Sequence, residues 1–245
     1  MLGKVALRRI QLCQCRKASS VLIANRGEIA VRIARAAGEL GFDAVGVYSQ
    51  DDKTWQQCSQ LNKMVALKGT GVAPYLDQTQ LIDVATANGC SYIHPGYGFL
   101  SENADFAEAC LRKNIKFVGP TSDQLRLFGD KIHARALAEE CNVPVIPGTN
   151  CVTDITQAQS FFKTLPPHTH MIVKARSGGG GRGIRVVKSF DEISQIMERC
   201  SSEATRAYGD GGLYVEMLVP AARHIEVQII GDGTTCYHVW DRECR

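Results

Sequence analysis

The feature that most constrains the fold is a regular alternation of short apolar runs with a helical pattern near the start of the chain. Residues 21–24 form an apolar run bounded by polar residues and glycine, which is typical of a strand buried on both faces. Residues 28–40 repeat apolar side chains at helical spacing and end at Gly41, and residues 44–48 form a second apolar run. A strand, a helix and a strand within roughly thirty residues predict a βαβ unit and a parallel sheet.

The alternation continues, which predicts a doubly wound parallel-sheet α/β domain over residues 19–130. The expected elements are a helix at 81–88, a strand at 91–93, a helix at 103–112, a strand at 116–118 and a helix at 122–128.

Beyond a helix expected at 131–141, the pattern changes and short strands dominate. The expected strands are 171–175, 184–187, 213–218, 224–230 and 235–240, with one helix at 190–206. Consecutive strands with glycine turns favour antiparallel pairing, so residues 131–245 are predicted to form an α+β second domain.

The charge is concentrated at the N-terminus, where the first twenty residues contain five basic side chains and no acid. Residues 1–18 therefore predict either a mitochondrial transit peptide, with the matrix as destination, or a basic tail of a cytoplasmic protein. The rest of the chain has a slight negative charge, so nucleic-acid binding has no support. No apolar run approaches the ~18 residues of a membrane-spanning helix, so no membrane partner is expected.

The ten cysteines are scattered, without a C-x-x-C pair or a neighbouring histidine at zinc-ligand spacing. Reduced thiols are expected rather than a disulfide framework or a zinc site.

The sharpest chemical signal is a glycine-rich stretch that contains Gly178, Gly179, Gly180, Gly181 and Gly183. Such a loop lets backbone N–H groups approach an anion closely. A Walker loop requires Lys-Ser/Thr next, and a dinucleotide fold requires a helix next, whereas an apolar strand pattern follows here. A strand, a glycine loop and a strand predict a hairpin over nucleotide phosphates, and a merely flexible turn is the alternative.

Four side chains outside the loop are further candidates. Lys174 precedes the loop on its entering strand, where its ammonium would neutralise phosphate oxygens. Lys131 follows Asp130 at an expected helix start, although capping by Asp130 and a solvated lysine explain that pattern equally. Glu216 and His224 lie at a strand end and a strand start, with nucleotide contact or a structural role open for both.

The segment 94–103 follows a strand of the first domain, and in an open α/β sheet ligands lie beyond the carboxyl ends of the strands. The loop is expected to border a site, with a structural role for His94 itself.

Several of these motifs occur together in one family. Residues 23–30, 94–103, 117–120, 129–131, 174–184 and 223–226 stand in the order found in biotin carboxylases. From residue 20 onward the chain resembles the biotin carboxylase components of acetyl-CoA, propionyl-CoA, methylcrotonyl-CoA and pyruvate carboxylases. The resemblance implies a pre-ATP-grasp domain followed by an incomplete ATP-grasp domain.

The resemblance also implies an activity. MgATP phosphorylates bicarbonate to carboxyphosphate, from which biotin on a carrier domain is carboxylated. Lys131 and Lys174 would contact the phosphates, and the Gly178–Gly181 loop would cover them. Glu216 and Leu218 would meet the adenine, with His224 near the ribose. The partners implied are biotin carboxyl carrier and carboxyltransferase parts, and a homodimer when complete.

The chain departs from the family at three places. Met217 replaces a lysine, and Arg176 replaces a small or neutral residue. The family's Mg²⁺-binding carboxylates, bicarbonate-binding arginine and catalytic base would follow residue 245, so neither a catalytic residue nor a metal ligand is assigned. The expected alternatives are a non-catalytic homologue that binds nucleotide or a carboxylase partner, and a relative of carbamoyl-phosphate synthase.

Overall fold

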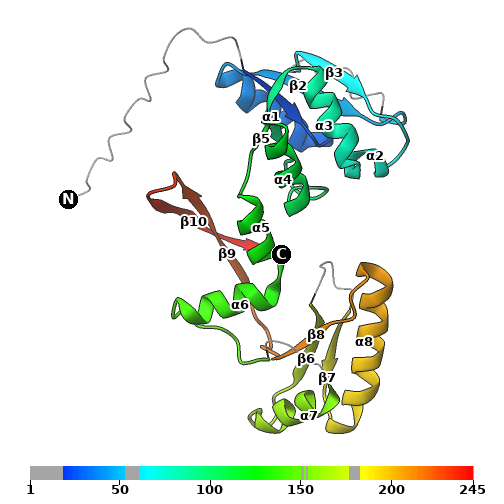
Figure 1. Ribbon diagram of the computed structural model, residues 1–245. Helices are drawn as coiled ribbons and strands as arrows, with labels where there is room; N and C mark the ends of the chain where they lie inside the picture. The colour runs from blue at the N-terminus through cyan, green and yellow to red at the C-terminus, as the bar shows by residue number, and fades with distance from the viewer. Residues whose placement is uncertain (1–18, 53–60, 150–151, 153, 177–182, 245) are drawn as a thin grey trace, which may run out of the picture. The chain divides into compact units, whose positions relative to one another are not determined.

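The computed structural model describes residues 19–52, 61–149, 152, 154–176 and 183–244. The expectations for residues 1–18 and for Gly178–Gly181 lie outside this part of the chain. Contacts divide the chain into two units, Met1–Gly129 and Asp130–Arg245, which are described separately. Figure 1 gives the element labels used below.

The first unit is built on a five-stranded parallel sheet with the order β3-β2-β1-β4-β5. Its strands are β1 (Ser20–Ile23), β2 (Asp43–Tyr48), β3 (Lys63–Ala66), β4 (Cys90–His94) and β5 (Lys116–Phe117). The chain leaves β1 in one direction towards β2 and later returns to its other side at β4. The carboxyl ends of β1 and β4 therefore border the crevice where ligands bind in open α/β sheets.

Helices cover both faces of this sheet because successive residues of a strand point to opposite faces. Helix α1 (Gly27–Glu39) packs on the face that carries Val21 and Ile23. Helices α3 (Gln78–Ala87) and α4 (Ala104–Arg112) pack on the face that carries Leu22 and Ile93. The predicted doubly wound α/β fold is confirmed.

Side-chain caps fix where two of these helices begin. Asp77 accepts a hydrogen bond from the Gln80 N–H at the start of α3, and Asn103 accepts one from the Phe106 N–H at the start of α4. Each cap satisfies a backbone donor that has no partner inside its helix. The unit is completed by α2 (Ala73–Leu76) and α5 (Ser122–Gly129).

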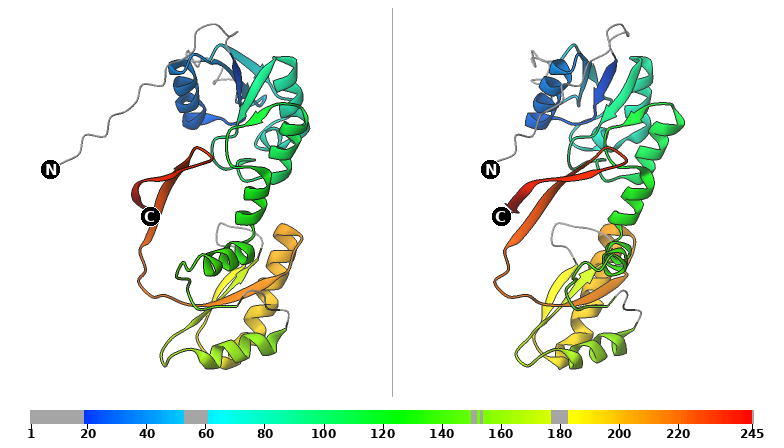
Figure 2. Two further views of the ribbon diagram at one scale, coloured as in Figure 1. Left: turned by 60° about the vertical axis from the view of Figure 1, so that its left-hand side comes forward. Right: turned by 90° about the vertical axis from the view of Figure 1, so that its left-hand side faces the viewer.

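The second unit contains a three-stranded antiparallel sheet with the order β7-β6-β8. The strands are β6 (Met171–Ala175), β7 (Ile184–Val187) and β8 (Leu213–Met217). Figure 2 shows α8 (Ile193–Tyr208) along one face and α6 (Lys131–Glu140) on the other. The remaining helices are α7 (Ile155–Thr164) and a 3₁₀ turn, η2 (Phe190–Glu192).

A separate hairpin follows, formed by β9 (His224–Gly231) and β10 (Cys236–Cys244) in antiparallel pairing. Its apolar side chains, including Val227, Ile229 and Trp240, are exposed. Together, the two antiparallel sheets confirm the predicted α+β character of the second part of the chain.

The structure also bears on membrane spans and on elements that the sequence did not predict. None of the described helices is long and apolar enough to cross a membrane. The elements β3, α2 and α7 are not predicted from the sequence, and the helix expected at 190–206 divides into η2 and α8.

The cysteines with described side chains, Cys90, Cys110, Cys141, Cys200 and Cys236, are free thiols. Burial raises the pKa of Cys90 and Cys200 to about 11 and that of Cys110 to about 12, so these three are neutral core residues.

Candidate functional site

Strand β6 separates the hydrophobic core of the second unit from the candidate site. Met171 and Val173 are buried with α8 in this core, together with Val215 of the neighbouring strand β8. The alternating side chain of Lys174 therefore projects from the opposite face of the sheet. Tyr214 lies directly across from Lys174 in the register between β6 and β8.

On this face, Lys174 forms an ion pair with Glu216. The Lys174 Nζ lies 2.6 Å from the Glu216 Oε2, and the side chains are 27% and 13% exposed. The same Nζ lies 5.9 Å from the centre of the Tyr214 ring. Burial, and then the nearby Glu216 carboxylate, raise the pKa of Tyr214 to about 12, so its hydroxyl is neutral at physiological pH.

The backbone of Glu216 is held by the segment that precedes α7. The Thr149 N–H donates to the Val215 carbonyl and the Met217 N–H to the Pro147 carbonyl, each at 2.8 Å. A Cβ at Gly148 would lie 2.7 Å from the Val215 oxygen, so only glycine allows this close approach.

Arg135 reaches the same carboxylate from α6. Its Nη1 lies 3.4 Å from the Glu216 Oε1, and its Nη2 lies 3.5 Å from Glu139. The side chain is 10% exposed, and its Nε is buried without a hydrogen-bond partner. Arg135 is not among the site residues predicted from the sequence. The available signal was its position four residues after Lys131, which places both on one helix face.

Asp130 joins the start of α6 to the end of β6. Its Oδ1 accepts hydrogen bonds from the N–H groups of Ile132 and His133, which confirms the predicted cap. Its Oδ2 accepts from the Arg176 guanidinium at 2.7 and 3.2 Å. Burial works to raise the pKa of Asp130, but Arg176 and the two backbone donors hold it below its ordinary value.

This lowered pKa predicts a pH dependence. The ion pair between Asp130 and Arg176 stabilises the fold at pH values above the ordinary carboxyl pKa. That contribution is lost as the pH falls from about 5 through the lowered pKa of Asp130 in the folded protein. Asp130→Asn keeps the cap but removes the charge, so we expect it to cost roughly 1 kcal/mol at neutral pH. Urea unfolding of the wild type and the variant should show this difference shrinking below about pH 4. Arg176→Gln should show the same pH-dependent loss of stability. A difference from the wild type that is the same at all pH values would contradict the ion pair between Asp130 and Arg176.

The structure brings some of the predicted site residues into contact and leaves others apart. Lys174 and Glu216 are in contact, and Leu218 follows β8, with its N–H donating to the His170 carbonyl. Lys131 is the first residue of α6 and its side chain is exposed. His224 begins β9, where its register partner is Cys244. Gly178, Gly179, Gly180 and Gly181 lie outside the described residues, but the strands on either side pair antiparallel, as the predicted hairpin requires.

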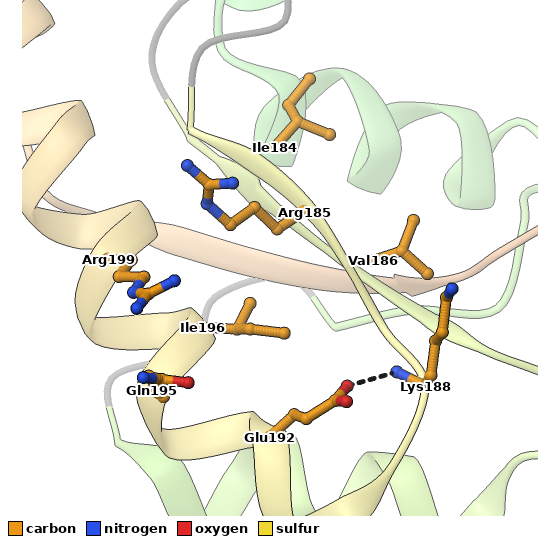
Figure 3. Close-up of a pocket in the computed structure, with 8 residues that line it drawn as sticks. All are labelled: Ile184, Arg185, Val186, Lys188, Glu192, Gln195, Ile196 and Arg199. Atoms are coloured by element: carbon orange, nitrogen blue, oxygen red, sulfur yellow. Dashed lines mark hydrogen bonds between the residues drawn. The ribbon is translucent and has the colours of Figure 1, made fainter.

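Within the described part of the chain, no group of three or more His, Cys, Asp or Glu side chains could hold a metal ion. A cavity of about 560 Å³ lies between β7 and the η2–α8 segment. Figure 3 shows its lining residues, among which Glu192 accepts a hydrogen bond from the Lys188 N–H. The cavity contains none of the predicted site residues.

The crevice of the first unit forms a hollow of about 350 Å³ beside the start of α1 and residues 97–99. Asn25 is buried beneath it, and its Nδ2 donates to the carbonyls of Pro95 and Tyr97 at 2.7 and 2.8 Å. The His94 Nδ1 accepts from the Gly96 N–H, and burial, followed by the charge of Arg32, lowers the pKa of His94. His94 thus has a structural contact, and its loop borders a hollow.

Asn25→Ala tests whether this amide holds the loop in place. The substitution leaves two carbonyl oxygens without their donor, so we expect it to lower the free energy of unfolding by about 2 kcal/mol. Chemical unfolding provides the value, and hydrogen exchange should increase in residues 95–99. Asn88→Ala is the matched control, because it removes one hydrogen bond, from the Asn88 side-chain amide to the Val84 carbonyl at a helix end. An equal loss from both variants would refute the special role of Asn25.

Comparisons with known proteins agree with this architecture. Residues 17–125 match the model of the biotin carboxylase N-terminal domain. Residues 130–245 match that of the carbamoyl-phosphate synthase L chain ATP-binding domain. The chain is 44% identical to the mitochondrial pyruvate carboxylase of Rattus norvegicus, covering 98% of this chain and 20% of that protein. It is 44% identical to Bacillus subtilis pyruvate carboxylase, covering 91% and 20%. It therefore spans about a fifth of these relatives.

Solved structures give the same result. A biotin carboxylase–βγ-ATP complex from Campylobacter jejuni matches with a TM-score of 0.88 and 38% identity, over 93% of this chain and 51% of that one. The biotin carboxylase domain dimer of Hydrogenobacter thermophilus 2-oxoglutarate carboxylase, in complex with MgADP, ADP and bicarbonate, matches with a TM-score of 0.85 and 35% identity, over 94% and 51%. The chain belongs to the biotin carboxylase family, with the N-terminal domain followed by an ATP-binding domain region of the kind found in pyruvate carboxylases.

Proposed function

We propose that this chain is the ATP-binding part of a biotin carboxylase, which forms carboxyphosphate from bicarbonate and MgATP and carboxylates biotin. The observation that carries the proposal is the ammonium of Lys174, which lies beside Glu216 on the α6 side of the sheet, opposite the core. An ATP-binding family fold and a cation on this face support nucleotide binding. The complexes with βγ-ATP and MgADP are properties of the two relatives and support the same assignment.

Each site residue then has a proposed task. Lys174 and Lys131 supply fixed positive charge to the phosphates, and the backbone N–H groups of Gly178–Gly181 add donors there. Glu216 and Leu218 lie along the adenine, and His224 lies near the ribose. Such preorganised charge favours phosphoryl transfer because negative charge on the transferred group is stabilised without reorganisation of water.

The described residues also limit what is proposed for Mg²⁺ and for partner proteins. The described residues offer no set of Mg²⁺ ligands, so Mg²⁺ enters only as the counter-ion of ATP. We propose that biotin carboxyl carrier and carboxyltransferase parts, in the same chain or in separate subunits, are the partners, and that the complete carboxylase domain forms a homodimer.

The decisive experiment is calorimetric titration of the folded chain with MgATP, followed by assay of bicarbonate-dependent ATP cleavage with free biotin. Binding is expected, without turnover by the chain alone. Binding with no turnover after addition of the remaining carboxylase parts would indicate a non-catalytic homologue. Failure to bind MgATP would refute the proposal. Carbamoyl-phosphate synthase chemistry is disfavoured because residues 17–125 match the biotin carboxylase N-terminal domain.

We also propose the mitochondrial matrix as the location. The basic, acid-free first residues support it, as do the mitochondrial relatives, while bacterial pyruvate carboxylases match as well. A fusion of residues 1–18 to a fluorescent reporter should enter mitochondria; a reporter that stays in the cytoplasm would favour the alternative location.

A further inference from the structure

Arg135 is a largely buried cation, with its side chain 10% exposed, and its hydrogen bonds are poorly satisfied. Its two carboxylate contacts are long, at 3.4 and 3.5 Å, and its Nε has no hydrogen-bond partner. Burial of a guanidinium costs free energy that only well-formed bonds offset. Buried polar groups normally have partners, so this arrangement is a poor way to stabilise a fold and points to a functional reason for the cation.

The partner of Arg135 is the carboxylate that also holds Lys174. Glu216 accepts from Lys174 at 2.6 Å through Oε2, and Arg135 lies at its other oxygen, Oε1. The three groups form a row of cation, anion and cation with a net charge of +1. The fourth charge, Glu139, is 45% exposed and contacts only the outer end of Arg135. Solvent therefore screens Glu139 more than it screens Glu216.

We propose that Arg135 is a positioning residue for the nucleotide: by sharing the Glu216 carboxylate, it leaves the positive charge of Lys174 available to a nucleotide phosphate. This rests on the proposed function, because Lys174 must face phosphate. The Lys174 ammonium has three N–H donors, so it contacts Glu216 and a phosphate oxygen together. Without Arg135, the carboxylate alone neutralises Lys174, and the local net charge falls to zero.

The proposal separates ligands by their phosphates. Arg135→Met preserves much of the aliphatic part of the side chain on α6 but removes the charge. It should weaken the binding of MgATP and MgADP by about 10-fold, because the attraction between Lys174 and phosphate decreases. Adenosine carries no phosphate, so its affinity should not change. Arg135→Lys restores the charge and should recover most of the affinity, which a purely steric role does not predict.

A double-mutant cycle distinguishes carboxylate sharing from a general effect of charge. Glu216→Gln removes the anion that holds Lys174. We expect it to raise MgATP affinity by about 10-fold in the Arg135→Met background but by less than about 3-fold in the wild type. Calorimetry with MgATP, MgADP and adenosine should be performed on the full chain. Arg185→Met removes an ion pair with Glu203 on the α8 side of the sheet and is the matched control, with unchanged affinities expected.

A measurement without nucleotide tests the same coupling. Acylation of Lys174 by an amine-reactive reagent, followed by mass spectrometry, should be about 3-fold slower in Arg135→Met than in the wild type, because Glu216 holds the ammonium more strongly. Lys188 serves as the internal reference. Arg135→Gln, which also removes the charge, provides the same comparison if the methionine variant does not fold.

Three results would overturn the inference. They are unchanged MgATP affinity in folded Arg135→Met, an equal effect of Glu216→Gln in both backgrounds, and unchanged acylation of Lys174. If the wild type binds MgATP and the cycle is additive, only the role of Arg135 fails. If the wild type binds no MgATP, the proposed function fails and this inference fails with it.

Discussion

Replacement of Lys174 by methionine is expected to lower the affinity of the chain for MgATP by about 100-fold, the size typical of a lost charge-assisted hydrogen bond. The methionine keeps much of the aliphatic stem near Tyr214, so the change isolates the ammonium. Glu216 retains Arg135 as a cationic neighbour, which limits the loss of stability. Calorimetry measures the affinity, and a thermal unfolding curve checks the fold.

Lys188→Met is the matched control for this prediction. Lys188 is an exposed lysine just after β7, outside the proposed nucleotide site, so its replacement should leave the MgATP affinity unchanged. A Lys174→Met protein that binds MgATP as tightly as the wild type would remove Lys174 from the site. An equal loss in both variants would indicate a general effect of net charge.

The largest expected effect on stability is that of Tyr75→Ala. Tyr75 is completely buried and stacks on Phe99, with ring centres 5.2 Å apart. Its hydroxyl accepts from the Ser49 N–H and donates to Asp52 at 3.0 Å, and Arg26 lies over its ring. Truncation leaves a cavity and an unsatisfied backbone donor, so we expect a loss of about 4 kcal/mol in the free energy of unfolding.

Two further variants divide this effect. Tyr75→Phe keeps the ring and should cost about 1.5 kcal/mol, the part due to the hydroxyl. Tyr237→Ala removes a tyrosine that is 63% exposed on β10, and should change stability by less than about 0.5 kcal/mol. Urea unfolding followed by circular dichroism gives the values, and hydrogen exchange in β4 assigns them to the first unit. A loss below about 1 kcal/mol for Tyr75→Ala would contradict the packing described.

The sequence predicts the elements better than it predicts their contacts. Strand β6 and the start of β8 are predicted correctly because a short apolar run is a local signal. The contact between Lys174 and Glu216 joins residues 42 positions apart, and depends on the register between two strands. Arg135 contributes from a third element, α6. Local sequence patterns therefore do not predict that these three charged side chains are in contact.

The missed elements have particular causes. Strand β3 is a four-residue edge strand without a fully buried side chain, and its local signal is a short apolar run at residues 64–67 between two lysines. Helix α7 buries Ala158 completely, while Ile155, Phe161 and Phe162 pack partly buried against the core of the second unit. Its best local signal is Asp154, whose carboxylate accepts from the Thr156 N–H at the helix start. In contrast, α1 combines a wide apolar face with flanking glycines, and is predicted nearly to its ends.

The alternation of Val173 and Lys174 along β6 also limits how this strand can change in length. One additional residue inside the strand would exchange its two faces, turning the ammonium towards α8 and a core side chain towards α6. Two additional residues would restore the orientation of both side chains. Insertions and deletions in this strand should therefore be far less tolerated in a functional protein than those in the connection between α8 and β8.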